Sequence, residues 1–173
     1  GRLILRVLLR RIDLMRFLLA SLFLTLGTSQ APAHCHQRSA TVLTCTIDHG
    51  TKQLEVCLDR EEAIYRFGPP DAPGLTLSAP ITEVAHQPWP GIGRAIWEST
   101  TFRNGDFTYE VYGSFDKLDQ ISDGGVTVRE NGREIASLSC DRGSTELGLF
   151  AISDAKEAAG QCWDAEAQHW GAC

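Results

Sequence analysis

The stretch TVLTCTIDHGTKQLEVCL, residues 41–58, decides the fold class, because apolar and polar side chains alternate on both sides of a short polar turn. The apolar positions on one face are Leu43, Cys45, Ile47, Leu54, Val56 and Leu58. Alternation with a period of two is typical of a β-strand that buries one face. The stretch therefore predicts a β-hairpin with its turn at residues 48–52.

The same period continues to about Cys140. The further alternating segments are residues 63–67, 75–78, 95–102, 107–112, 125–130 and 133–140. The dipeptides Asn104-Gly105 and Asn131-Gly132 separate the last four into two hairpins, because a type I′ turn needs two residues that tolerate positive φ. The sequence therefore predicts an all-β fold of about eight antiparallel strands, closed as a barrel or folded as a sandwich.

The alternation weakens after Cys140. Residues 144–152, STELGLFAI, fit either a short helix or a strand, and residues 153–173 are rich in alanine with two tryptophans and two cysteines. We expect a helical turn or two in this C-terminal segment, held onto the sheet by disulfides.

The N-terminal residues have the features of a secretory signal peptide. Residues 17–26, FLLASLFLTL, form an uncharged apolar run after Arg16, and Ala31-Pro32-Ala33 supplies small residues for cleavage. A membrane span would need roughly 20 apolar residues, so the run favours removal over anchoring. The alternative, one long helix over residues 1–26, conflicts with five arginines in that range.

We expect translation to start at Met15 and the exported chain to begin after Ala33, as a single β domain over residues 34–173. Five of the 16 basic and one of the 22 acidic residues precede that point, which leaves a formal charge of −10. Such a surface repels nucleic acid and anionic lipid, so neither nucleic acid nor, after cleavage, a membrane is an expected partner. A basic protein partner suits it, although acidity also serves solubility alone.

The six cysteines all lie in the expected exported part: Cys35, Cys45, Cys57, Cys140, Cys162 and Cys173. An even number in an exported chain predicts disulfides, and the spacings do not fit a zinc ribbon or knuckle. Alternation places Cys45 and Cys140 on the core face, whereas Cys57 points outward beside Glu55. We expect a Cys45–Cys140 bridge, with Cys57 and Cys35 bonded to the tail cysteines; a Cys45–Cys57 bridge is the main alternative.

The sequence predicts no catalytic residue. It contains no G-x-S-x-G motif, and Cys162 in QCW is better explained by a disulfide than as a thiol nucleophile. We therefore expect a protein that binds rather than catalyses. An enzyme with acid and base residues dispersed along the chain is the alternative, and it would need a deep polar pocket.

The loop HQPWPGIGRAIWE, residues 86–98, is the first candidate binding surface. Trp89 stands between two prolines and is followed by two glycines and Arg94, and exposed Trp and Arg dominate binding hot spots. Trp89 could equally plug one end of a barrel. Tyr112 and Ser114, where a strand is expected to end, form the second candidate, with an ordinary turn as the alternative.

His34 and His36 form a candidate metal site. Cleavage after Ala33 would place His36 third, so that the α-amino group, two amide nitrogens and an imidazole can surround Cu²⁺ or Ni²⁺ in a square plane. His34 could add a second imidazole. The alternative is a terminus without metal, and no other cofactor is expected.

Residues 43–140 resemble a group of small exported bacterial β-proteins of uncharacterised activity. The segments that carry the resemblance are LTCTIDHGTKQLEVCL, YRFG, LTLS, GRAIWESTTFRNGDFTYEVYGSFD and GGVTVRENGREIASLSC. The resemblance implies a periplasmic or secreted bacterial β-protein and carries no activity with it.

A more distant resemblance is to the bacterial inhibitors of c-type lysozyme, which are small exported antiparallel β-barrels. LTCTIDHGTKQLEV, residues 43–56, is similar to their opening region of a cysteine, a polar turn with glycine and an alternating strand. These inhibitors insert a loop with Ser-Gly and a following Tyr into the lysozyme cleft. The nearest match here is Tyr112-Gly113-Ser114, with the order inverted and no following Tyr.

From these features we expect an exported periplasmic protein that binds or inhibits a protein partner in the cell envelope, with a cell-wall hydrolase as the candidate. Loop residues near Trp89, Arg94 and Ser114 would make the contact. The alternative is an envelope metal-binding protein that uses His34 and His36.

Overall fold

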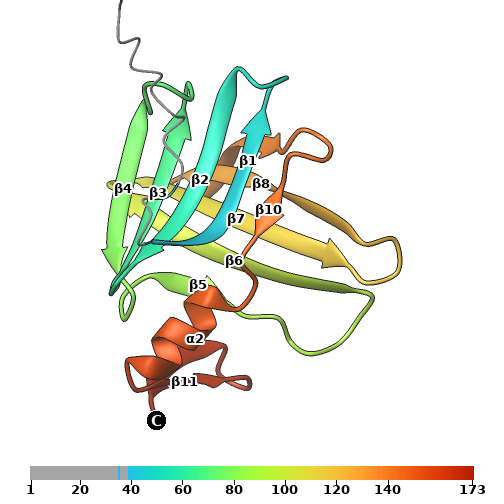
Figure 1. Ribbon diagram of the computed structural model, residues 1–173. Helices are drawn as coiled ribbons and strands as arrows, with labels where there is room; N and C mark the ends of the chain where they lie inside the picture. The colour runs from blue at the N-terminus through green and yellow to red at the C-terminus, as the bar shows by residue number, and fades with distance from the viewer. Residues whose placement is uncertain (1–34, 36–38) are drawn as a thin grey trace, which may run out of the picture. The chain divides into compact units, whose positions relative to one another are not determined.

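Two antiparallel β-sheets make up most of the computed structural model, which describes Cys35 and residues 39–173 (Figure 1). The first sheet contains β1 (Ala40–Ile47), β2 (Lys52–Asp59), β3 (Glu62–Gly68), β4 (Leu75–Pro80) and β10 (Glu146–Leu147). The second contains β5 (Ala85–Gln87), β6 (Ala95–Asn104), β7 (Phe107–Asp116), β8 (Ile121–Glu130) and β9 (Arg133–Ser139). The expected signal peptide, the start at Met15 and cleavage after Ala33 lie outside the described residues.

The two sheets form a sandwich, which is one of the two arrangements that the sequence predicted. Their strand orders are β10-β1-β2-β3-β4 and β5-β6-β7-β8-β9, and in Figure 1 the strands of the second sheet run across those of the first. The predicted barrel is wrong, because within the described residues no strand ladder continues from one sheet into the other. All eight predicted strands are present, and the short strands β5 and β10 extend the two sheets.

The core lies between the sheets and is centred on Tyr65 of β3. Its ring centroid lies 5.5 Å from those of both Phe102 of β6 and Tyr109 of β7. Burial raises the pKa of the Tyr65 hydroxyl above its usual value. The core residues of β1 and β2 are those that the alternation predicted: Leu43, Cys45, Ile47, Leu54 and Val56. Burying each large apolar side chain stabilises the fold by about 1.5–3 kcal/mol.

The two Asn-Gly hairpins are present, with different turns. Asn131 and Gly132 both have positive φ, 49° and 79°, as a type I′ turn requires. Asn104 instead pairs with Phe107, so the two-residue loop is Gly105-Asp106. Of those two residues only Gly105 has a positive φ, 58°, which is the pattern of a type II′ turn. The predicted turn is therefore displaced by one residue.

The disulfides confirm one expected pairing and correct the others. Cys45–Cys140 joins β1 to the residue after β9 and so connects the two sheets. Cys57 pairs with Cys35, not with a tail cysteine, because Cys35 lies over the outward face of β2 that carries Cys57. The remaining pair is Cys162–Cys173.

The C-terminal segment contains the expected short helix, α2 (Ala151–Ala158), followed by an unexpected hairpin of β11 (Gln161–Asp164) and β12 (His169–Ala172). The disulfide of this segment closes the hairpin and does not tie it to the sheet, which corrects the expectation. Packing attaches the segment instead, since Ile152 of α2 is 1% exposed in the core. Within the described residues, no helix is long and apolar enough to cross a membrane.

Candidate binding surface

Two loops meet at one end of the second sheet. Residues 88–94 lead into β6, and residues 117–120 join β7 to β8. Arg94 connects them, since its Nε lies 2.6 Å from Oδ2 of Asp116 and its Nη2 donates to the carboxylate of Asp119. The amide of Lys117 donates to the Arg94 carbonyl at 3.4 Å. The two loops therefore form one structural unit.

Trp89 holds the first of these loops in place. Its indole Nε1 donates to the carbonyl of Ile92 at 3.0 Å, and Nζ of Lys117 lies 4.9 Å from the ring centroid. A cation over an aromatic face is attracted by the ring quadrupole. Half-buried Trp89 therefore packs within its own loop rather than filling one end of the sandwich.

Apolar side chains stand exposed around these contacts. The exposed fractions are 74% for Ile92, 73% for Leu118, 55% for Ile121 and 39% for Trp97. Single exposed apolar residues are ordinary, whereas several of them close together beside polar residues form a candidate interaction surface. The loop-end surface is defined as Ile92, Arg94, Trp97, Asp116, Leu118, Asp119 and Ile121.

Strand register places the other predicted residues on or beside this surface. β7 continues to Asp116, so Tyr112 and Ser114 lie within its last residues and not in a turn. Ser114 lies opposite Trp97 of β6, on the outer face next to the loop-end surface. Tyr112 lies further along the same face, opposite Ser99. The structure thus brings Trp89, Arg94 and Ser114 to one end of the sheet, with Tyr112 beside them.

In the loop-end surface, the ion pair of Arg94 with Asp116 shifts the pKa values of both groups so that each stays charged. The Arg94 guanidinium, together with the backbone N–H groups of Asp119 and Leu118, lowers the pKa of the Asp116 carboxyl to about 2. The same hydrogen bond with Asp116 raises the pKa of Arg94. Both groups therefore stay charged at neutral pH, and the loops keep their connection.

A second polar cluster, which sequence reasoning missed, lies buried between the second sheet and α2. Nδ1 of His86 lies 3.0 Å from Oγ1 of Thr100, and its Nε2 lies 3.1 Å from Oγ of Ser153 and 3.6 Å from Oε1 of Glu98. The Ser153 hydroxyl donates to Glu98 Oε1 at 3.3 Å. The sequence nevertheless carried a signal for this cluster. In the alternation of β6, Glu98 and Thr100 fall on the same face as the core residue Phe102, which indicates buried polar side chains.

The geometry of this cluster suits attachment of the helix rather than nucleophilic catalysis. A catalytic histidine faces the nucleophile with one nitrogen and the carboxylate with the other, whereas Nε2 of His86 faces both Ser153 and Glu98. Ser153 donates its proton to Glu98, so its oxygen is left to accept the Nε2 proton of His86. Oε2 of Glu98 also accepts the amide of Phe150 at 2.7 Å, just before α2. A carboxylate at a helix N-terminus is stabilising.

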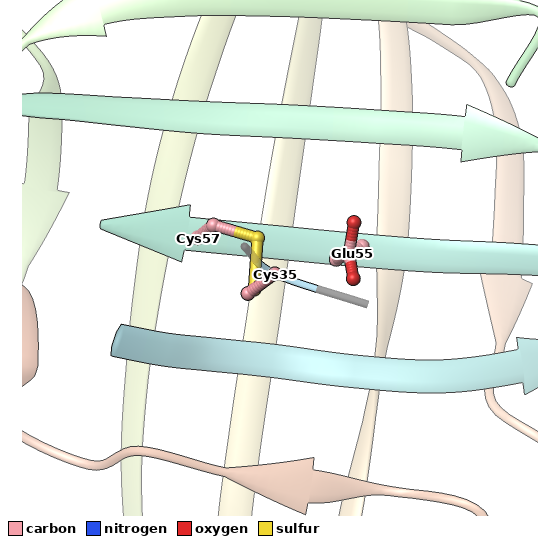
Figure 2. Close-up of side chains that lie close together, drawn as sticks. All are labelled: Cys35, Glu55 and Cys57. Atoms are coloured by element: carbon pink, nitrogen blue, oxygen red, sulfur yellow. A yellow bond between two sulfur atoms is a disulfide. The ribbon is translucent and has the colours of Figure 1, made fainter. Parts of the chain in front are cut away.

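A third cluster lies on the outward face of β2. Figure 2 shows Glu55 next to the Cys35–Cys57 disulfide, and the two sulfurs and one carboxylate oxygen all lie within 4.8 Å of one another. Arg66 of β3 donates to Glu55 Oε2 at 3.0 Å, and its Nη1 lies 3.9 Å from Sγ of Cys57. The predicted placement of Cys57 beside Glu55 is confirmed, whereas Arg66 and Cys35 were not expected there.

The predicted copper or nickel site at His34 and His36 lies outside the described residues and stays a prediction. The three disulfides are typical of a protein that folds in an oxidising compartment.

A scan against models of known protein families finds no match, and searches of curated proteins and of solved structures find no significant match either.

Proposed function

We propose that this protein is an exported, non-catalytic binding module that docks a basic protein partner on its loop-end surface. The observation that carries the proposal is the exposure of Ile92, Leu118 and Ile121 around the ion pairs of Arg94. When a partner covers these apolar side chains, the removal of their surface from water favours the complex by roughly 25 cal/mol per Å².

Preorganisation supports the proposal. A binding loop that is mobile before association loses conformational entropy on binding, which weakens the affinity. Here Arg94 joins the two loops to each other, and Trp89 fixes the first loop through Ile92 and Lys117. The exposed apolar side chains are therefore presented on a loop pair that is already ordered.

The charge of the chain supports a basic partner. The residues after Ala33 carry a formal charge of −10, which would steer a basic protein toward the surface. Residues 43–56 resemble the opening region of the inhibitors of c-type lysozyme, so a c-type lysozyme is the candidate partner. The disulfides and the expected signal peptide fit a periplasmic or secreted bacterial location.

The buried polar cluster supports binding over catalysis. The cavity beside His86 and Glu98 has a volume of only about 20 Å³, far less than a substrate pocket needs. Ser153 next to it is 8% exposed and fastens α2. These groups are explained by their structural role.

Calorimetric titration of the protein into c-type lysozyme, with muramidase activity measured in parallel, tests the proposal. We expect saturable binding, and loss of muramidase activity at excess protein. Ile121→Asp should weaken binding by about tenfold or more, which is roughly 1.4 kcal/mol, because it places a charge among buried apolar contacts.

Ile135→Asp is the matched control, since Ile135 is 48% exposed on β9, outside the loop-end surface. It should bind as the unmodified protein does. No binding by the unmodified protein would exclude this partner, and equal effects of the two substitutions would exclude this surface.

A further inference from the structure

We propose that reduction of the Cys35–Cys57 disulfide creates a zinc site on the outward face of β2, with Cys35, Cys57 and Glu55 as ligands. The three side chains already stand together, with their ligand atoms within 4.8 Å of one another (Figure 2). The proposal is independent of the loop-end surface and of its partner.

The carboxylate of Glu55 is the feature that points to a ligand. Glu55 is 2% exposed, and its Oε2 accepts a hydrogen bond from Arg66. Its Oε1 is the one buried side-chain polar atom without a hydrogen-bond partner in the described part of the chain. A buried oxygen without a hydrogen-bond partner destabilises the fold, and more so when it is charged. A cation bound at Oε1 would remove that cost.

The disulfide governs access to the site. While the two sulfurs are bonded to each other, neither is a thiolate ligand. A dithiol reductant transfers two electrons and two protons to the Cys35–Cys57 bond, which gives two thiols, and the reductant closes to its own disulfide. When zinc binds, both thiol protons are released to water.

The donor set and the local charge favour zinc. Zinc accepts cysteine sulfur together with carboxylate oxygen in a tetrahedral arrangement, and water completes the fourth position. Two thiolates and one carboxylate carry three negative charges, which Zn²⁺ and the neighbouring Arg66 balance. Arg66 lies 3.9 Å from Sγ of Cys57 through Nη1, so its charge is held next to the site.

The other disulfides lack this environment. Among the described residues, Cys35, Glu55 and Cys57 are the one group of three potential metal ligands of the Cys, His, Asp or Glu type that lie close together. Neither Cys45–Cys140 nor Cys162–Cys173 belongs to such a group. A third ligand therefore distinguishes this pair from the other two.

The first test uses the unmodified full chain, reduced by a phosphine without oxygen and titrated with Co²⁺ and then Zn²⁺. We expect one equivalent of cobalt, with thiolate-to-cobalt absorption that zinc abolishes, and no binding by the oxidised chain. Compared with the zinc-free reduced chain, bound zinc should protect Cys35 and Cys57 from alkylation, while the exposed Cys162 and Cys173 react as before. Equal binding by the oxidised chain, or protection of a different pair, would overturn the site.

Substitutions test the ligands separately. Glu55→Gln should weaken zinc binding by about tenfold or more, and Arg66→Gln should weaken it by about tenfold through the lost neighbouring charge. The double substitution Cys162→Ser with Cys173→Ser is the control and should retain one equivalent. An unchanged affinity in Glu55→Gln overturns the three-ligand site. If that variant loses its native circular dichroism, the alkylation pattern of the unmodified chain decides.

Discussion

Glu98 joins separate parts of the molecule through one buried carboxylate. It belongs to β6, accepts the Phe150 amide that precedes α2, and accepts the Ser153 hydroxyl from within the helix. Such hydrogen bonds to a charged group contribute about 1.5–3 kcal/mol each, and a partner left unsatisfied in the interior costs a similar amount. A single polar residue at a core position therefore fixes where the helix lies.

Removal of this carboxylate should loosen the helix. Glu98→Ala is expected to lower the free energy of unfolding by about 2 kcal/mol, because the Phe150 amide loses its acceptor. Glu98→Gln should cost less, since its amide oxygen can still accept that bond. Urea denaturation measures both values, and equal losses in the two variants would contradict the assigned contact.

Asp116 should titrate well below an ordinary aspartate. Its pKa is about 2 in the folded protein, against an ordinary value of 3.8, because Arg94 stabilises the carboxylate. A lowered folded pKa contributes stability above pH 3.8 that is lost as the pH falls toward 2. Carboxyl chemical shifts followed by NMR against pH measure this value. Arg94→Gln should move it back toward 3.8, and titration of the unmodified protein near 3.8 would refute the ion pair.

Among the elements, the passage from β10 to α2 depends on a close backbone approach. The Gly148 amide donates to the Val42 carbonyl at 3.0 Å. A Cβ added at Gly148 would lie 1.9 Å from the carbonyl oxygen of Thr41, and that backbone cannot turn aside as a flexible side chain could. The glycine thus lets the chain run against β1 before the helix begins.

Gly148→Ala should therefore be costly. We expect a loss of about 2–3 kcal/mol in the free energy of unfolding, the upper part of the range for overpacking, because the added Cβ would clash with backbone. Gly74→Ala is the matched control, because its Cβ would meet only the Phe67 carbonyl oxygen at 3.8 Å, and it should stay within about 0.5 kcal/mol. Thermal denaturation measures both variants. Equal stability of Gly148→Ala and Gly74→Ala would contradict the close backbone approach at Gly148.

The longer elements could be predicted from the sequence, and the shortest could not. Alternation located the eight longer strands because each has enough residues to show a period. β5 and β10, with three and two residues, are too short for any pattern. The hairpin of β11 and β12 was hidden by alanine-rich sequence; it is held by Trp163 against Trp170, 5.6 Å apart, and by its own disulfide.

At the scale of the whole molecule, Cys45–Cys140 is the disulfide that connects the two sheets among the described residues. It closes 95 residues, whereas Cys162–Cys173 closes 11 at the end of the chain. In the chain-entropy description, the longer loop stabilises the fold by about 4–5 kcal/mol and the shorter by about 3 kcal/mol at most. Removal of Cys45–Cys140 should therefore destabilise the fold more than removal of Cys162–Cys173.

Paired substitutions to alanine should show that difference. Loss of Cys45–Cys140 is expected to lower the unfolding temperature of the whole sandwich, through the gain in unfolded-state entropy and the small cavity left in the core. Loss of Cys162–Cys173 should lower it less. Scanning calorimetry compares them, and a larger effect of the tail pair would contradict the assigned roles.

The candidate surface could be predicted only in part. Residue type singled out Trp89 and Arg94, but the partner of Arg94 at Asp119 lies 25 residues away, and sequence does not show that the two loops meet. Nor does the sequence show that Leu118 and Ile121 are exposed beside that contact. For the same reason alternation placed Cys57 beside Glu55 but could not place Cys35 there.

Hydrogen exchange of the protein, alone and saturated with c-type lysozyme, shows directly whether the loop-end surface is where a partner binds. If the partner binds the loop-end surface, exchange should become slower only in residues 88–97 and 114–121. Slower exchange on β9 or in the C-terminal hairpin instead, or no change at saturating lysozyme, would contradict it.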